Sequence, residues 1–259
     1  MKTITILNEK GGVGKTTLAV NLAMGLAARG HRVLLVDAEE QGHATLAVGV
    51  RKYPGLYDLL VRDASFREVL KPVDPTKYGD SGKSRLYLVG SNVETRNIVT
   101  SISDAMKFKN RLEELAGQFD YCIVDTAPTP SLLHASIYFA ADGVLIPTEC
   151  EFLSLDGLVE TMNRAKAIAT YYHTGLHVLG IVPNKYRAST IEHRENLAKL
   201  QEQFGALVWR PIPLSIVWAE AAMFALPVFH YTPDHDAASI VWEIVDHLEA
   251  TYASGSTKR

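Results

Sequence analysis

The sequence predicts a single α/β domain with one doubly wound, mostly parallel sheet and helices on both of its faces. Short runs rich in β-branched and aliphatic residues alternate with longer segments of helical periodicity along the 259 residues, as crossover connections between parallel strands require. Several short runs are nearly continuous in Val, Ile and Leu, which indicates strands buried on both faces. Apolar residues make up 47% and charged residues 21%, a globular balance that permits such a core.

The expected elements follow from these runs and from the Gly, Pro and Asp residues at their ends. The predicted strands are Thr3–Asn8, His31–Asp37, Leu86–Gly90, Tyr121–Asp125, Gly143–Pro147, Val178–Pro183 and Leu207–Ile212. The predicted helices are Thr16–Arg29, Ser101–Gln118, Ser131–Ala141, Leu155–Tyr172, Ile191–Phe204, Ile216–Ala225 and Ala237–Tyr252. In the first of these helices, Leu18, Leu22 and Leu26 fall on one face, as the period of an α-helix requires.

Residues 1–253 are expected to form the one domain, and residues 51–85 within it show a weaker pattern. The segment from Asp74 to Lys83 is rich in Asp, Pro, Gly and Ser, so a less regular, exposed insertion is predicted there rather than a domain boundary. Residues 254–259 lack apolar side chains and are expected to form a flexible tail.

Composition argues against several classes of protein. Cys122 and Cys150 lie far apart in apolar runs, which indicates buried thiols in a reducing compartment. The amino terminus lacks the pattern of an export signal, and no stretch approaches the roughly 20 apolar residues that cross a bilayer. We therefore expect a cytoplasmic protein. A net charge of −3 argues against a uniformly basic nucleic-acid binder, although a local basic patch stays open.

A glycine-rich loop follows the first predicted strand and opens the first predicted helix. In this context backbone N–H groups wrap phosphates, and the amino end of the helix adds partial positive charge. Lys15 is expected to reach the β and γ phosphates of a nucleotide, and the Thr16 hydroxyl to bind Mg²⁺. Glycine-rich turns without ligands also occur, but Gly-Lys-Thr-Thr at this position favours a phosphate loop. The predicted nucleotide-binding residues of the loop are Gly11, Gly12, Val13, Gly14, Lys15, Thr16 and Thr17.

The segment from Lys10 to Thr16 resembles the deviant Walker A motif, Lys-Gly-Gly-x-Gly-Lys-Thr, of the ParA/MinD family. The resemblance covers nearly the whole chain and implies a P-loop NTPase domain, ATP and Mg²⁺ as cofactors, and a nucleotide sandwich homodimer. It also implies that Lys10 reaches across this dimer to the phosphates of the partner subunit. A lysine in that place would neutralise charge that develops on the leaving phosphate, so ATP binding and dimerisation would be coupled.

Two acidic segments resemble other motifs of the family. Phe119–Pro128 is similar to the Walker B segment and implies that Asp125 belongs to the Mg²⁺ shell, with a helix cap as the alternative. Leu34–Thr45 resembles the first switch, in which Asp37 keeps one carboxylate and Glu39 stands in place of the aspartate that positions water. The predicted catalytic residues are Lys10, Lys15, Asp37 and Glu39. Because glutamate is one methylene longer than aspartate, we expect hydrolysis to be slow or adapted.

Segments after two later strands complete the predicted site. Ile146–Leu158 resembles a family segment that implies a place for Glu151 at the dimer interface, near the nucleotide or Lys10; a solvated charge before a helix is the alternative. Arg187 stands where the Asn-Lys-x-Asp motif of GTPases has the aspartate that pairs with guanine, so ATP is favoured over GTP. The resemblance places Asn184 and Pro213 beside adenine.

The expected partners depend on Leu214–Ala221. This segment resembles Arg-x-Val-Arg-x-Ala-Glu-Ala of ParA proteins but lacks both arginines, which removes two phosphate contacts and weakens the case for non-specific DNA binding. A second basic face could hold DNA instead, and solvated surface charges are the alternative reading of its residues. These residues are Lys185, Arg187, Arg194, Lys199 and Arg210. The carboxy-terminal segment is poorly suited to a basic amphipathic helix, so no membrane partner is expected.

The resemblance implies a ParA-like ATPase whose ATP-bound homodimer partitions or positions a plasmid, a chromosome or a protein organelle. Its partners would be an adaptor protein of ParB type, which stimulates hydrolysis, and non-specific DNA of the nucleoid. The alternative is an ATP-dependent switch of the same fold that binds only protein.

Overall fold

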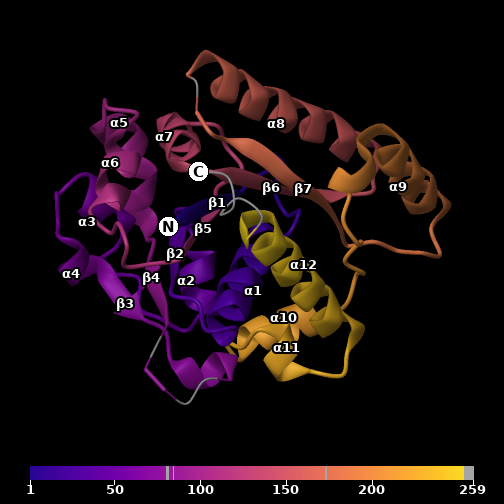
Figure 1. The fold of residues 1–259 in the computed structure, drawn as a ribbon, viewed down its shortest axis with the longest axis horizontal. Helices are drawn as coiled ribbons and strands as arrows, with labels where there is room; N and C mark the ends of the chain where they lie inside the picture. Colours follow the sequence, from indigo (N-terminus) through magenta and orange to yellow (C-terminus); the bar gives the residue numbers. More distant parts are fainter. Residues whose placement is uncertain (80–81, 84, 173, 254–259) are drawn as a thin grey trace.

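A 7-stranded sheet forms the centre of the structure (Figure 1). The computed structural model describes residues 1–79, 82–83, 85–172 and 174–253, and only the backbone of residues 152–156. The strands lie in the order β3-β4-β2-β5-β1-β6-β7; β3 is antiparallel to β4, and the other neighbouring pairs are parallel. Their bounds are β1 Lys2–Ile6, β2 Val33–Ala38, β3 Leu70–Pro72, β4 Leu86–Val89, β5 Tyr121–Thr126, β6 Gly143–Glu149 and β7 His177–Asn184.

Helices cover both faces of this sheet, which confirms the predicted fold class. α1, α11 and α12 pack on one face, whereas α3 to α9 pack on the other (Figure 1). The helices are α1 Lys15–Ala28, α2 His43–Ala47, α3 Leu56–Leu60, α4 Phe66–Val69, α5 Ile98–Ser101, α6 Lys107–Glu113, α7 Leu132–Ala140, α8 Phe152–Tyr171, α9 Ile191–Phe204, α10 Val217–Met223, α11 Val228–Tyr231 and α12 Asp236–Ala253. Three 3-10 turns accompany them: η1 Pro75–Tyr78, η2 Val93–Asn97 and η3 Gly205–Leu207.

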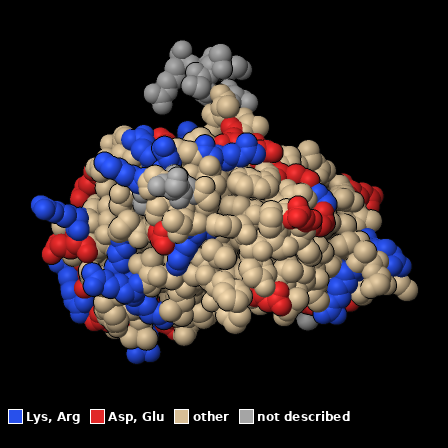
Figure 2. Space-filling view, turned by 90° about the horizontal axis from the view of Figure 1, so that it is seen from below, with Lys and Arg blue, Asp and Glu red and all other residues tan. Residues whose placement is uncertain are grey.

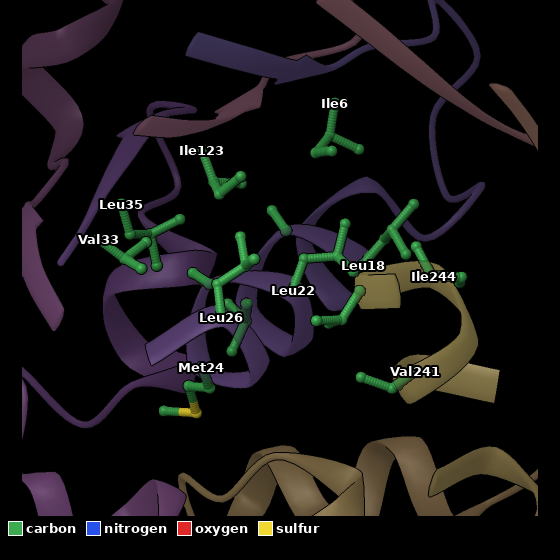
Figure 3. Packing of buried hydrophobic residues seen from close by; sticks show 14 of the residues in the cluster. Ile6, Leu18, Leu22, Met24, Leu26, Val33, Leu35, Ile123, Val241 and Ile244 are labelled. Carbon is green, nitrogen blue, oxygen red and sulfur yellow. The ribbon is translucent and has the colours of Figure 1, made fainter. Parts of the chain in front are cut away.

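Helix α1 is buried on almost every side because it lies between the sheet and α12. Figure 3 shows its side chains, Leu18 and Leu22 among them, between Ile123 of β5 and Val241 of α12. Successive strand residues point to opposite faces, so that Leu35 joins this cluster and Leu34 joins the core on the other face. Burial on both faces explains the continuous apolar runs of the strands. Because β1 and α1 are both packed in this core, both ends of the loop that joins them are held in place.

One predicted strand is wrong. The structure describes all of Leu207–Ile212, and this segment forms no strand: Val208 makes an isolated bridge to Ile181 of β7, and Pro213, the residue after the segment, makes another to Tyr186. Pro211 and Pro213 have no N–H group to donate to a ladder, which interrupts the pairing. The sheet is completed instead at its opposite edge by β3, within residues 51–85, which the sequence prediction missed.

One predicted helix is too long. Ser101–Gln118 contains only the end of α5 and the shorter helix α6. Between them the Asp104 side chain accepts a hydrogen bond from the Met106 N–H at 2.7 Å, a local bond that competes with helical hydrogen bonding. The other predicted helices agree with the structure to within a few residues.

Residues 51–85, predicted as a less regular insertion, contain α3, α4, β3 and η1. The predicted tail, residues 254–259, lies outside the described residues. Cys122 and Cys150 are both buried and free, as predicted. Among the helices that the structure describes, none is long and apolar enough to cross a membrane.

The carboxyl ends of the parallel strands meet at one edge of the sheet and collect the acidic residues that the sequence indicated. The register places Asp37 of β2 opposite Asp125 of β5, and Glu149 of β6 opposite Asn184 of β7. The glycine-rich loop leaves β1 between these two pairs, since β1 lies between β5 and β6. Ligands of doubly wound sheets bind at such an edge, where the strand order reverses.

Candidate nucleotide-binding site

The glycine-rich loop needs glycine at two of its positions. Gly12 and Gly14 adopt φ angles of 78° and 91°, in the left-handed region that side chains disfavour. At Gly14 a Cβ atom would also lie 2.1 Å from Nδ2 of Asn184. At Gly11, by contrast, no described atom would come within 4 Å of a Cβ. The loop conformation therefore depends on Gly14, which lets Asn184 approach.

Lys15 lies inside the loop. Its side chain is buried, and Nζ donates to the carbonyl oxygens of Asn8 and Lys10 at 2.9 and 3.0 Å. Burial lowers the pKa of the Lys15 ammonium, although the nearby Asp125 and Glu39 charges oppose that change. Lys15 is the first residue of α1, whose amino end has no side-chain cap in the described part of the chain. The ammonium and the N–H groups of this helix end can therefore attract the same anion.

Asn8 holds the start of the loop, and the sequence analysis missed it. Its Oδ1 accepts a hydrogen bond from the Lys10 N–H at 2.8 Å, and its Nδ2 donates to the Pro147 carbonyl at 2.8 Å. Asn8 closes the first predicted strand, and an amide at such a position was the available signal. Through these two bonds, Asn8 links the loop to β6.

Asp125 is a buried carboxylate at the end of β5. Neither of its oxygens has a hydrogen-bond partner among the described residues, which removes the alternative reading of a helix cap. Burial and the neighbouring Asp37 charge raise the pKa of Asp125 well above its ordinary range. The Thr16 hydroxyl lies close enough to oppose this rise without reaching hydrogen-bond geometry.

This arrangement fits Mg²⁺, a hard cation that prefers oxygen ligands and needs only one or two carboxylates beside phosphate oxygens. The structure brings the two predicted metal residues, Thr16 and Asp125, together. Clusters of three or more His, Cys, Asp or Glu side chains that could hold a metal are absent from the described residues. The chain thus offers a site that a bound phosphate would complete.

Asp37 is also buried, but its oxygens are occupied. Oδ2 accepts hydrogen bonds from the Thr45 N–H at 2.8 Å and the Thr45 hydroxyl at 2.7 Å, and Oδ1 accepts one from the Glu39 N–H at 3.2 Å. Asp37 therefore holds the loop between β2 and α2. The Glu39 carboxylate lies 3.1 Å from Nδ1 of His43. The catalytic assignments of Asp37 and Glu39 stay predictions.

Lys10 lies at the rim of the loop, where 32% of its side chain is exposed. Its ammonium forms ion pairs with Glu149 at 2.9 Å and with Glu151 at 3.1 Å. Partial burial alone would lower the pKa of Lys10, but hydrogen bonds to the two glutamates outweigh it, and the pKa is raised. Glu151 therefore lies near Lys10 within one subunit. Its place at a dimer interface stays a prediction.

Glu149 and Lys185 belong to the same cluster. Glu149 was not predicted as a site residue, and Lys185 was predicted only as a candidate for a basic DNA-binding face. The two oxygens of Glu149 contact different lysines, since Oε2 pairs with Lys10 and Oε1 pairs with Lys185 at 2.9 Å. Burial would raise the pKa of Glu149, but hydrogen bonds from Lys10 and Lys185 lower it. Lys185 is also one of the few residues other than glycine with a positive φ, 52°.

A cavity of about 270 Å³ lies beside the loop, where the resemblance placed adenine. Pro213 and Asn184 both line it, together with Gly12, Gly14 and Thr17. Asn184 is held in place because Nδ2 donates to the Val13 carbonyl at 2.7 Å and Oδ1 accepts from the Lys185 N–H at 2.8 Å. The remaining lining residues are Leu18, Asn21, Lys185, Ile212, Leu214, Ser215, Trp218, Ala219, Ala222 and Val241.

Comparisons with known proteins decide the family. A family model described as an AAA domain matches residues 1–178. The sporulation initiation inhibitor protein Soj of Bacillus subtilis is 32% identical over 253 residues, which cover 96% of this chain and 98% of Soj. The chromosome-partitioning ATPase Soj of Thermus thermophilus is 31% identical, and the match covers 96% of each chain. This chain belongs to the Soj/ParA family of ATPases. The predicted family and the predicted class, an ATP hydrolase, are therefore confirmed.

Solved structures agree with the fold. A complex of Cyanothece McdA with ATP superposes with a TM-score of 0.83 over 96% of either chain, at 24% sequence identity. At that identity the likeness shows the fold alone. The shared fold accommodates ATP in McdA.

Proposed function

We propose that this Soj/ParA family member is an ATP-dependent switch that closes into a sandwich homodimer and thereby partitions or positions cargo. One observation carries the proposal: the two lysines of the loop occupy different places. Lys15 is buried inside the loop, whereas Lys10 lies at its rim on Glu149 and Glu151, with 32% of its side chain exposed. A lysine at the rim can serve the phosphates of a second subunit, and Lys15 those of its own.

Each predicted site residue then has a defined task. Lys15 and the N–H groups of the loop bind the triphosphate, while Thr16 and Asp125 hold Mg²⁺. Bound Mg²⁺ supplies positive charge that neutralises the phosphate oxygens. Asp37 positions the loop that carries Glu39, and Glu39 orients the attacking water. Asn184 and Pro213 enclose the adenine.

The proposed partners follow from the family. The relative from Thermus thermophilus bears the name of a chromosome-partitioning ATPase, which supports a cytoplasmic, nucleoid-associated protein with an adaptor of ParB type. In the closed dimer the chain would bind non-specific DNA, and adaptor-stimulated hydrolysis would release it. Two of the five basic candidates for a DNA face, however, form ion pairs within the protein: Lys185 pairs with Glu149, and Arg210 pairs with Asp236 and Glu243.

A specific observation favours the second candidate, a switch that binds only protein. Leu214 and Val217 stand where ParA proteins carry the two arginines. Leu214 and the neighbouring Ile216 are exposed, and so are Met223 and Phe224 at the end of α10. Figure 2 shows a broad face, which includes the α10 and α11 region, in which uncharged residues predominate and Lys and Arg gather toward the ends. Exposed apolar surface of this kind is typical of protein interfaces, whereas DNA phosphates require clustered positive charge.

A gel-shift titration with unrelated duplex DNA, in the presence and absence of ATP, tests the proposal. ATP-dependent binding whose affinity falls steeply with salt supports the DNA-bound switch. Equal failure to bind under both conditions, with normal ATP-dependent dimerisation, favours the protein-binding switch. Failure to dimerise with ATP contradicts both candidates.

A further inference from the structure

Glu149 lies between two lysines that come from different parts of the chain. Lys10 contacts Oε2 and Lys185 contacts Oε1, both at 2.9 Å. Only 10% of the Glu149 side chain is exposed. The carboxylate is thus largely shielded from solvent, and each of its oxygens is compensated by a separate ammonium group.

The two lysines differ in how they are held. Lys10 lies in the glycine-rich loop, and its other carboxylate partner, Glu151, has a side chain that is 51% exposed. Lys185 follows β7 directly, its N–H donates to Asn184, and its backbone has the left-handed φ of 52°. β7 is joined to β6 in register, with Glu149 opposite Asn184. The backbone of Lys185 is therefore anchored at the end of β7, although 44% of its side chain is exposed, whereas Lys10 lies in the loop.

The proposed function requires Lys10 to leave Glu149 when it reaches the partner subunit's phosphates. A largely buried carboxylate that loses its partner is strongly destabilising. Glu149 would keep one partner after this departure, because the Lys185 contact uses the other oxygen. Such a retained partner reduces the free energy needed to move Lys10.

We propose that Lys185 is a positioning residue that keeps Glu149 compensated and so permits Lys10 to move from its own subunit to the nucleotide of a second copy of the chain. The inference rests on the proposed function. Lys185 also lines the cavity beside the loop, but the inference concerns its ion pair with Glu149. The residue acts through Glu149 on the equilibrium between monomer and ATP-bound dimer.

A double-mutant cycle tests this assignment, since coupled residues in one ion-pair network give non-additive effects. The variants are Lys185→Met, Lys185→Arg, Glu149→Gln and the double variant Glu149→Gln with Lys185→Met. Lys199→Met, an exposed lysine of α9, is the matched control. Dimerisation at saturating ATP is measured by sedimentation velocity over a range of protein concentrations, and folding by thermal unfolding.

We expect Lys185→Met to weaken dimerisation at saturating ATP about 10-fold or more. Lys185→Arg and Lys199→Met should dimerise like the wild type. In the double variant, Glu149→Gln should restore dimerisation, because no carboxylate charge then needs a partner. Normal dimerisation of folded Lys185→Met at saturating ATP, or no rescue by Glu149→Gln, overturns the inference.

The proposed function fails separately. If Lys10→Ala still dimerises with ATP, the proposed task of Lys10 is wrong whatever Lys185 does. If Lys10→Ala stays monomeric while Lys185→Met dimerises normally, only the assignment of Lys185 is wrong.

Discussion

Asp125 and Glu149 are carboxylates near the carboxyl ends of the two strands that flank β1, yet their surroundings are opposite. Asp125 is fully buried, and in the described part of the structure neither of its oxygens has a hydrogen-bond partner. Glu149 has a lysine on each oxygen. Burial raises the pKa of Asp125, whereas at Glu149 the two lysines outweigh burial and the pKa is lowered.

The difference separates two halves of the site. The half around Asp125 gathers buried carboxylates beside Lys15 and Thr16, so its unbalanced negative charge suits a divalent cation. The half around Glu149 balances its charge with lysines of the chain itself. A cation that binds in the first half supplies positive charge that the chain lacks there. A movement of Lys10 in the second half must instead replace its ion pair with Glu149 by another one.

The largest expected effect concerns the lysine inside the loop. If the two halves have separate tasks, Lys15→Ala abolishes measurable ATP binding, because neither Lys10 nor Lys185 can replace a cation directed at the nucleotide's phosphates. Calorimetry with ATP and Mg²⁺ measures this directly. Lys10→Ala, the matched lysine at the rim, should bind ATP as a monomer; retained ATP affinity in Lys15→Ala breaks the comparison.

A second variant examines the metal half. Asp125→Ala should lower the rate of ATP hydrolysis about 100-fold, as expected when charge stabilisation at a phosphoryl group is lost. It should also remove the dependence of ATP affinity on Mg²⁺, which calorimetry with and without the metal measures. An unchanged Mg²⁺ dependence in a folded Asp125→Ala protein would show that Asp125 does not hold the metal.

A third test compares two glycine variants of the loop, which Asn184 contacts at the boundary between the halves. Gly14→Ala should destabilise the fold by about 2 kcal/mol, because it combines a strained φ with a close contact to Asn184. Gly11→Ala meets no described atom within 4 Å and should change the free energy of unfolding by less than about 0.5 kcal/mol. Urea unfolding of both variants measures the difference, and equal effects would contradict the structure.

The smallest expected effects are the changes in stability with pH that the two carboxylates cause. The pKa of Asp125 in the folded chain is raised above its ordinary value of 3.8. As pH rises above 3.8, the Asp125 carboxyl therefore ionises first in the unfolded chain. The wild type then loses stability relative to Asp125→Asn. The pKa of Glu149 is lowered from 4.5. Its stabilisation relative to Glu149→Gln is therefore present above pH 4.5 and is lost as pH falls through the lowered pKa.

Urea unfolding between pH 4 and 7 measures both differences. The account requires opposite signs at neutral pH, with Asp125→Asn more stable and Glu149→Gln less stable than the wild type. Two variants that shift stability in the same direction would remove the contrast between the halves.

Local sequence patterns predicted most of the fold and the metal half of the site. Strands buried on both faces are continuous apolar runs, and the phosphate loop is a contiguous motif whose glycines, Lys15 and Thr16 are read together. Asp125 was found because it ends such an apolar run. These features depend on residues close in sequence, which a single chain displays directly.

The Glu149 half could not be predicted because its contacts join residues far apart in sequence. Whether Glu149 faces Asn184 depends on the register of β6 with β7, and that register shifts by an irregularity between Val144 and Leu145. Leu207–Ile212 was predicted as a strand because its apolar content is typical of strands. Pro211 and Pro213, however, limit the pairing beside β7 to isolated bridges. The edge strand β3 is too short and contains too few apolar residues to give a signal.

The most direct test of the account is the oligomeric state of Lys10→Ala. Light scattering on the wild type and on Lys10→Ala, each with ATP and Mg²⁺ and again without nucleotide, reports whether the rim lysine couples ATP to dimerisation. The account predicts that ATP converts the wild type to a dimer, whereas Lys10→Ala binds ATP and stays a monomer. A dimer of normal stability in ATP-bound Lys10→Ala would contradict it.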